Sequence, residues 1–209
     1  MKTSQKPFFI LILTILLSAC TLDIASERPQ SIQYIEKNDK KWQQHLQKIK
    51  QIKQYQAQGQ LGYINNKQRF STRFTWQYNN PQSYSLLLSS TFSSSILKFE
   101  VSPFGITVSD HKGNQRSTKD INNLLREMIG ISIPLQQIGN WLKGQPDENS
   151  DYQVGINHLL ASFTYSVEGE VWSADYLNYR TDQSIPLPKD ILLKSSEQTL
   201  KVRIDNWKY

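Results

Sequence analysis

Cys20 is the only cysteine in the 209-residue chain, and it directly follows Leu17, Ser18 and Ala19. Two lysines near the N-terminus precede an apolar run over residues 8–17. A positive start, a short apolar core and small residues before a cleavage site are the parts of a secretory signal peptide. The run of about ten residues is too short to cross a hydrocarbon core of about 30 Å as a helix. The sequence therefore predicts a signal peptide over residues 1–19 that is cleaved before Cys20.

The position of Cys20 at the cleavage site gives its thiol a specific chemistry. The site looks like a bacterial lipobox, in which the thiol receives a diacylglyceryl group and the new amine of Cys20 is acylated. An ordinary signal peptide with a chance cysteine is the alternative. Thr21 follows instead of the Asp that usually retains lipoproteins in the inner membrane of enterobacteria-like cells. We therefore expect a lipid anchor on the periplasmic face of the outer membrane of a Gram-negative bacterium, firmly held because each buried methylene contributes about 0.8 kcal/mol.

No catalytic group stands out in the rest of the sequence. His45, His111 and His158 are far apart, and none has the spacing to a second ligand that is typical of a metal site. The sequence has no nucleophile elbow, P-loop or dinucleotide motif. With Cys20 committed to lipid, neither a thiol nucleophile nor a disulfide is expected. These observations indicate a protein that is not an enzyme and binds no metal, with a hydrolase built from spatially convergent residues as the alternative.

Charge and length limit the functions and the domain organisation that the rest of the chain can have. The formal net charge of +6 includes the two lysines of the signal peptide, and the other basic residues are scattered among acidic ones. This pattern is typical of solvated surface and does not favour nucleic-acid binding. Residues 20–33 lack apolar periodicity and are predicted to be the lipidated N-terminus and a tether. Residues 34–209 are long enough for a single domain with a sizeable core.

The hydrophobic period changes several times along this domain. It predicts a helix over about residues 35–55, whose apolar face covers a core or, less in keeping with its narrow stripe, lies on a membrane surface. Strict alternation then predicts short antiparallel strands over residues 59–110. Two helices follow, the first capped by Thr118 and ending at Gly130, the second running from Pro134 to Gly144. Strands return up to the C-terminus. This order indicates an α+β fold in which helices pack over one face of a large antiparallel sheet.

Aromatic residues on the apolar side of these elements have two interpretations. Stripes of tryptophan, tyrosine and phenylalanine usually form a packed core. A curved sheet beneath a helical lid can instead leave an apolar cavity suited to acyl chains, and periodicity does not distinguish the two. A related choice concerns Phe92, the one aromatic residue in the serine- and threonine-rich loop 89–95. Phe92 either dips into a membrane interface or folds back onto the core.

Several segments, taken in their order along the chain, resemble the LolB family. They include Arg73-Phe74-Thr75-Trp76-Gln77, the stretch from Gly130 to Leu135 that continues to Trp141-Leu142-Lys143-Gly144, and the ending Lys201-Val202-Arg203-Ile204-Asp205-Asn206-Trp207. The resemblance runs from about residue 42 to residue 207. It implies a half-open antiparallel β-barrel of LolA/LolB type, closed by helices around a hydrophobic cavity. Phe92 falls where the family has a protruding loop with an apolar tip, although Thr91 and Ser93 replace the usual Pro and Gly there.

The resemblance also implies a function. Members of the family accept acylated lipoproteins from a LolA-like periplasmic carrier and insert them into the outer membrane, in contact with its phospholipid and without ATP or a cofactor. We expect a monomer. An anchored structural or interaction lipoprotein without acyl-chain transfer is the alternative. Our candidates for the cavity wall are apolar residues from the predicted strands and helices: Phe74, Trp76, Leu86, Leu88, Phe99, Ile133, Trp141 and Trp172.

The lipobox interpretation predicts that Cys20→Ala abolishes labelling of the protein by radioactive palmitate in growing cells. The reason is that the thiol is the acceptor of the first lipid, and later acylation follows cleavage at the same residue. Ser18→Ala, which keeps a small residue before the cleavage site, should still be labelled. Labelling that persists in Cys20→Ala would exclude this site of lipidation.

Overall fold

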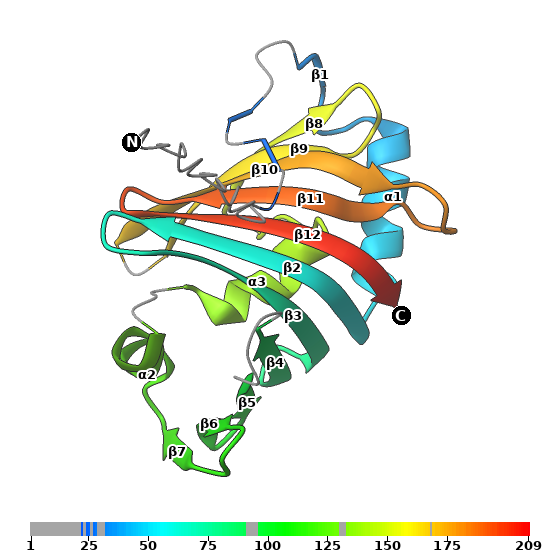
Figure 1. Ribbon diagram of the computed structural model, residues 1–209. Coiled ribbons are helices and arrows are strands. Elements are labelled where there is room, and N and C mark those ends of the chain that lie inside the picture. The colour runs from blue at the N-terminus through cyan, green and yellow to red at the C-terminus, as the bar shows by residue number, and fades with distance from the viewer. Residues whose placement is uncertain are drawn as a thin grey trace, which may run out of the picture.

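The computed structural model describes residues 22, 24–25, 27–28, 32–90, 96–129, 133–167 and 169–209 (Figure 1). The predicted signal peptide, Cys20 and Phe92 lie outside these ranges. Within them, no helix has the length and apolar character needed to cross a membrane.

One antiparallel sheet organises the described residues. It contains twelve strands in the order β1-β8-β9-β10-β11-β12-β2-β3-β4-β5-β6-β7. Their bounds are β1 Tyr34–Ile35, β2 Tyr55–Asn65, β3 Arg69–Asn80, β4 Ser83–Ser89, β5 Ile96–Ser102, β6 Gly105–Asp110, β7 Gln115–Thr118, β8 Asp151–Gly155, β9 Leu160–Val167, β10 Glu170–Arg180, β11 Leu187–Lys194 and β12 Gln198–Lys208. The edge strands β1 and β7 do not pair with each other, so the sheet is open. Together with the helices on one face, this architecture confirms the predicted α+β fold.

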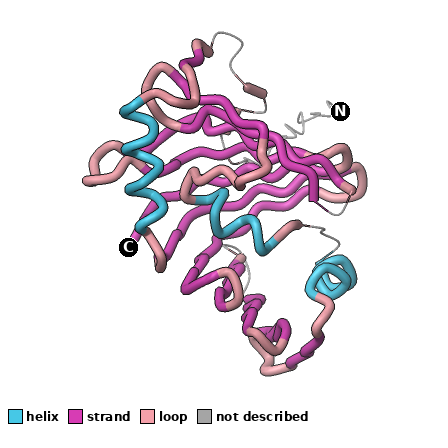
Figure 2. The backbone as a smooth tube through the Cα atoms, turned by 180° about the vertical axis from the view of Figure 1, so that it is seen from behind, coloured by secondary structure: helices cyan, strands magenta, loops and turns pink. Residues whose placement is uncertain are grey.

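Alternation along the strands assigns one face of the sheet to the core. In β3, Phe74, Trp76 and Tyr78 are buried, while Thr75 and Gln77 between them are only partly covered. Trp76 pairs across the sheet with Ala57 and Leu86, which are also buried. Successive side chains of a strand point to opposite faces, so paired residues on neighbouring strands share one face. The result is a continuous apolar inner face, which α1 and α3 cover (Figure 2).

Helix α1, Lys40–Gln51, is shorter than the helix predicted over residues 35–55. Its N-cap is Asp39, whose side chain accepts a hydrogen bond of 2.9 Å from the backbone N–H of Trp42. Before the cap, Ile35 pairs with Val154 in the sheet, and after the helix Tyr55 begins β2. The predicted helix was too long because apolar residues of the two adjoining strands extend its periodic pattern without a break.

Helices α2, Ile121–Ile129, and α3, Leu135–Leu142, correspond to the two predicted central helices. The predicted N-cap Thr118 is wrong, because this residue pairs with Ile106 as the end of β7. Asp120 has the capping role instead, since its Oδ1 accepts a hydrogen bond of 3.0 Å from the N–H of Asn123. Gly130 lies outside the described residues. Helix α3 follows Pro134 and ends before Gly144, whose φ of +76° suits glycine at a helix C-terminus.

His45 on α1 makes the fold sensitive to acid. Burial, reinforced by Lys48, lowers the pKa of His45 to about 4. The unfolded chain therefore takes up this proton below about pH 6.5, whereas the folded protein takes it up only near pH 4, so the free energy of unfolding falls as the pH drops through this window.

We predict that His45→Gln, which is neutral throughout, removes a pH-dependent loss on the order of 3 kcal/mol between pH 6.5 and 4. Urea unfolding at several pH values measures this loss. His111→Gln, at an exposed turn, is the matched control and should keep the wild-type slope. An unchanged slope in His45→Gln would assign the acid sensitivity to other groups.

Candidate functional site

An apolar hollow lies on the inner face of the sheet, beneath α3. Strands β2, β3, β4, β11 and β12 form its floor, and the residues at and before α3 form its roof. The lining is aliphatic or aromatic throughout: Leu61, Phe74, Trp76, Leu86, Ile133, Leu135, Ile138, Leu142, Leu193, Leu200 and Val202. No polar side chain contributes to it, so the hollow can attract hydrocarbon but provides no group for bond-making chemistry.

The volume of this hollow is about 40 Å³. A cavity needs about 10–15 Å³ to hold one water molecule, and an apolar cavity of this kind stays dry. The space is therefore far smaller than a fatty-acyl chain requires. A guest of that size would fit here only if part of the roof moved.

Two buried tyrosines hold the roof in place. The hydroxyl of Tyr55 on β2 donates a hydrogen bond of 2.6 Å to the carbonyl of Gly139, and that of Tyr176 on β10 donates one of 2.7 Å to the carbonyl of Trp141. Burial raises the pKa of both phenols well above the ordinary value, so both remain neutral donors. These bonds fix α3 from two sides of the sheet, since the two strands lie on either side of β11 and β12.

Gly139 allows α3 to lie directly on an aromatic ring. A Cβ atom at this position would lie 2.3 Å from Cε2 of Tyr78, far inside contact distance. Tyr78 in turn stacks on Tyr55, with ring centroids 5.2 Å apart. The same residue therefore receives the hydrogen bond of Tyr55 and provides the close approach to Tyr78. A side chain here would force either α3 or the ring of Tyr78 to shift.

The C-terminal end of α3 has a third attachment, to the end of α1. The ammonium of Lys143 is buried and donates a hydrogen bond of 3.0 Å to the carbonyl of Ile52. Burial, with a further contribution from Lys53, lowers the pKa of Lys143 to about 8. The N-terminal end of α3, where Leu135 and Ile138 border the hollow, has no such polar attachment to the sheet among the described residues. The roof is therefore held mainly at one end.

Four of the predicted cavity-wall residues, Phe74, Trp76, Leu86 and Ile133, line the hollow together. The other four lie elsewhere. Leu88 borders a separate, open pocket of about 330 Å³ beside Phe70 and Leu97. Phe99 is fully buried on β5, where it pairs with Leu86 and Val108. Trp141 on α3 contacts Trp172 on β10, with ring centroids 6.3 Å apart, and neither lines the hollow. The acyl-binding role of all eight residues remains a prediction.

Sequence reasoning missed the part of the floor formed by β11 and β12. Leu193, Leu200 and Val202 lie beside Leu61, because Leu200 pairs with Leu193 and Val202 pairs with Leu61. The alternation of Leu200 and Val202 with charged residues was visible in the sequence and placed them on the apolar face. The sequence did not show that the last strand, β12, lies next to β2 in the middle of the sheet.

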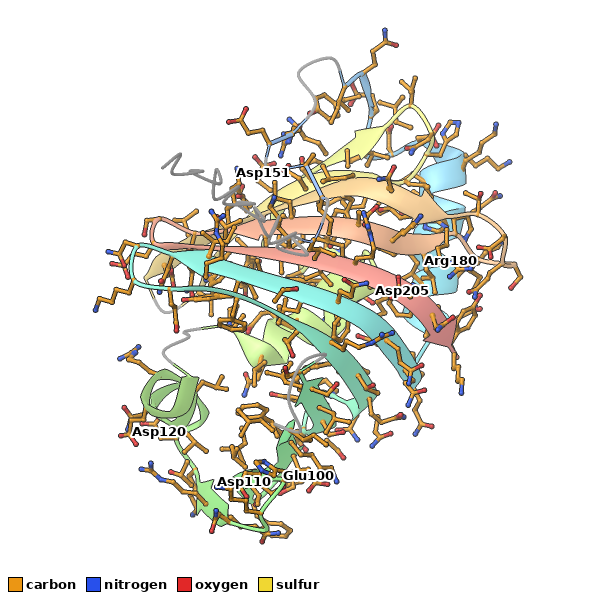
Figure 3. The ribbon with its side chains drawn as sticks, viewed as in Figure 1. Glu100, Asp110, Asp120, Asp151, Arg180 and Asp205 are labelled. Atoms are coloured by element: carbon orange, nitrogen blue, oxygen red, sulfur yellow. The ribbon has the colours of Figure 1, made fainter. Side chains whose placement is uncertain are left out.

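Most ionisable groups lie on the outside of the molecule, with His45, Lys143, Asp175 and Asp190 as buried exceptions among the described residues. Figure 3 shows Asp110, Asp120 and Glu100 on the part formed by β5–β7 and α2, and Asp151 on β8 at the other side of the sheet. Arg180 is hydrogen-bonded to the carbonyl of Asp205 and paired with Asp182. In the described ranges, no three His, Cys, Asp or Glu residues group in a way that could hold a metal ion. Hydrocarbon binding is the chemistry to which the inner face is suited.

Comparison with known proteins identifies relatives along almost the whole chain. The family described as "Outer membrane lipoprotein LolB" matches residues 53–207. A protein of Mannheimia succiniciproducens named "Outer-membrane lipoprotein LolB" is 55% identical over 206 residues, which cover 98% of each chain. One of the same name from Haemophilus influenzae strain Rd is 54% identical over 211 residues, covering 100% of this chain and 99% of its own.

The fold is also found among solved structures. A LolA superfamily protein from Nitrosomonas europaea superposes with a TM-score of 0.52 at 12% sequence identity, over 79% of this chain and 92% of its own. At this identity the similarity concerns the fold alone. It shows that an open antiparallel sheet with helices on one face recurs in a protein of very different sequence.

The attachment of α3 leads to a prediction about its dynamics. Replacing both Tyr55 and Tyr176 with Phe removes one hydrogen bond from the carbonyl of Gly139 and one from that of Trp141, which keeps the bond donated by the N–H of Gly144, at a cost of about 0.5–1.5 kcal/mol each. Amide hydrogen exchange should accelerate in α3 more than in α1. Tyr63→Phe, which removes a buried hydroxyl bonded to Gln198 and not to α3, is the control. Equal acceleration in α1 and α3 would show a general loss of stability instead of a release of the roof.

Proposed function

The chain belongs to the LolB family of outer-membrane lipoproteins, and from this we propose that it takes acylated lipoproteins from a soluble LolA-like carrier and delivers them to the outer-membrane bilayer. Its place in lipoprotein localisation, as an outer-membrane lipoprotein, follows from the family. The use of the inner face as the container for acyl chains, the carrier as donor and phospholipid as acceptor are the parts that we propose. We also propose that the protein acts as a monomer and without catalysis.

The observation that carries this proposal is the wholly apolar hollow beneath a helix that is attached mainly at one end. An acyl chain in water is costly, so it has to pass directly from one apolar container to another. The hollow offers such a container once α3 swings away from Phe74, Trp76 and Leu86. Apolar contacts between α3 and the floor are then exchanged for contacts with the acyl chain, and little net apolar surface is exposed.

Because of this exchange, the free-energy change for moving an acyl chain from the carrier to this protein is small. If two containers bury the same methylenes, the free-energy difference between them is small, and about 1.4 kcal/mol changes the distribution tenfold. Delivery to the bilayer is favourable because burial in hydrocarbon contributes about 0.8 kcal/mol per methylene. No chemical energy source is needed for either step.

The parts of the chain outside the hollow have proposed roles as well. We assign residues 1–19 to the signal peptide, Cys20 to lipidation and residues 34–209 to the acyl-binding domain. Phe92 is proposed to enter the membrane interface during delivery. The support for this role is its aromatic character in a polar loop and the family position that it occupies.

A two-step transfer assay tests the proposal. A purified LolA-like carrier loaded with a fluorescent lipoprotein is mixed with this protein, and liposomes are then added. We expect Phe92→Glu to receive the lipoprotein normally but to deliver it to liposomes at least about tenfold more slowly, since a carboxylate resists entry into hydrocarbon.

The matched control is Phe104→Glu, because Phe104 is 87% exposed in the turn at the other end of β5 and should tolerate the same change in both steps. Normal delivery by Phe92→Glu would remove the proposed role of that residue. Failure of the wild-type protein to take any lipoprotein from the carrier would contradict acyl transfer and favour a purely structural lipoprotein.

A further inference from the structure

The described residues between Cys20 and β1 lie against the outer face of the sheet, opposite the helices. Figure 1 shows this segment in front of β10–β12, and Figure 2 shows the helices on the other side. Lys201 donates a hydrogen bond of 2.8 Å from Nζ to the carbonyl of Ile24. Arg28 forms an ion pair with Asp175. We call Leu22, Ile24 and Arg28 the docked segment, since each has a contact with the sheet.

The contacts of the docked segment follow one transverse row of the sheet. Gly62 pairs with Lys201, Lys201 with Leu192, and Leu192 with Asp175. Leu22 lies over the first of these, since a Cβ atom on Gly62 would be 3.7 Å from its Cδ2. The segment therefore crosses the strands from β2 to β10.

Leu192, in the middle of this row, is shielded from water. Both neighbours of Leu192 in β11 belong to the core cluster on the inner face, so alternation places Leu192 on the outer face. It is nevertheless fully buried, and Ile24 of the docked segment is only 5% exposed. A hydrogen bond and an ion pair thus hold a segment that the sequence alone presents as a tether, and apolar side chains on both sides are buried.

Docking leaves a very short free connection to the lipid. Cys20 precedes Leu22 by two positions, and an extended residue spans at most about 3.6 Å, so the anchor lies within about 7 Å of the docked segment. Gly62, beneath Leu22, is close to the end of β2: Asn65 lies about 10 Å farther along the strand at about 3.4 Å per residue. The anchor therefore lies nearer to this end of the sheet than to the end at Tyr55.

The same end carries other features suited to a lipid surface. Lys67, in the turn between β2 and β3, and Arg69, the first residue of β3, are both exposed. Within the described ranges, neither forms an ion pair. Ser90 and Ile96, which flank the segment containing Phe92, lie at this end of β4 and β5, since Ser89 pairs with both Arg73 and Ile96. Cations beside a loop with an aromatic residue match the phosphates and hydrocarbon of a bilayer.

We propose that the docked segment fixes the orientation of the domain on the outer membrane, with the β2–β3 hairpin and its Lys67 and Arg69 against lipid phosphates. The proposal rests on the lipid anchor of the proposed function. It places Phe104, at the far end of β5, in the aqueous periplasm. A free tether would instead let the domain tumble above the bilayer.

Two insertions of equal length distinguish docking from a free tether. A ten-residue Gly/Ser linker spans about 18 Å on average. Placed between residues 21 and 22, it separates the anchor from the docked segment. Placed between residues 31 and 32, it lengthens the chain by the same amount but leaves the anchor beside the docked segment. Only docking makes the two proteins behave differently.

Orientation is read in the lipidated protein on liposomes of phosphatidylethanolamine and phosphatidylglycerol. An environment-sensitive fluorophore is attached to a single new cysteine, Asn66→Cys or Phe104→Cys, and quenched by a lipid labelled at its headgroup. We expect strong quenching at residue 66 and little at residue 104 in the parent protein and in the 31/32 insertion. The difference should be lost in the 21/22 insertion.

A double variant tests the proposed contact of Lys67 and Arg69 with lipid phosphates. Lys67→Gln with Arg69→Gln should reduce quenching at residue 66 on these liposomes, with Lys53→Gln and Lys208→Gln as the control pair of exposed lysines. An unchanged signal would overturn the phosphate contact, and so would quenching that appears only after a carrier protein is added. Equal effects of the two insertions, or equal quenching at residues 66 and 104 in the parent, would overturn docking.

Acyl transfer measured on the same liposomes separates this proposal from the proposed function. Transfer without a fixed orientation contradicts docking alone. A fixed orientation without transfer contradicts the receptor function alone. Circular dichroism of each insertion protein confirms that the sheet is retained.

Discussion

The inner face of the sheet must be covered, and the remainder of the structure follows from how this is done. Aromatic rings stack across neighbouring strands on this face: Trp76 on Tyr84 at 5.0 Å and Tyr55 on Tyr78 at 5.2 Å between centroids. Such a surface is unfavourable in water at about 25 cal/mol per Å². A short helix, α3, covers much of it and is joined to the sheet by two phenol-to-carbonyl bonds and to the end of α1 by one buried lysine.

The polar and the apolar contacts of α3 lie at different ends of the helix. The polar attachments are concentrated from Gly139 to Lys143, whereas the residues that precede them meet the floor only through apolar contacts. Apolar contacts have no fixed geometry, so a hydrocarbon chain can replace them at little cost. Directional hydrogen bonds at the other end keep the helix in place during such an exchange. A protein that transfers acyl chains needs both properties: a surface that hydrocarbon can occupy and a fold that survives the occupation.

How far the sequence predicts this arrangement depends on the range of the interactions involved. Alternation in β3 and β5 was enough to place Phe74, Trp76 and Phe99 on the buried face, because a strand has a strict period of two. The ends of α1 were misplaced where apolar strand residues continued its pattern. Trp141 and Trp172 were assigned to the same wall as Trp76, but Trp141 on α3 contacts Trp172 on β10, and neither lines the hollow. That division depends on strand order and on the seating of a helix, neither of which periodicity contains.

The outer face shows a second limit of local reasoning. Residues 20–33 have the composition of a tether, yet part of this segment contacts the sheet through Lys201 and Asp175, which lie far along the chain. Polar segments without periodicity are usually left unassigned because their partners are distant in sequence. In this protein those partners connect the anchoring end of the chain to the scaffold that contains the hollow.

Saturable binding of a fluorescent acyl probe to the unlipidated Cys20→Ala protein tests the central claim most directly. Titration calorimetry at several temperatures should give a defined stoichiometry and a negative heat-capacity change, the marker of apolar burial. An Ile138→Trp variant, which overfills the hollow, should bind more weakly, while Ile156→Trp at an exposed site should bind normally. Non-saturable binding to a folded protein, or equal affinity in both variants, would contradict an acyl-chain container beneath α3.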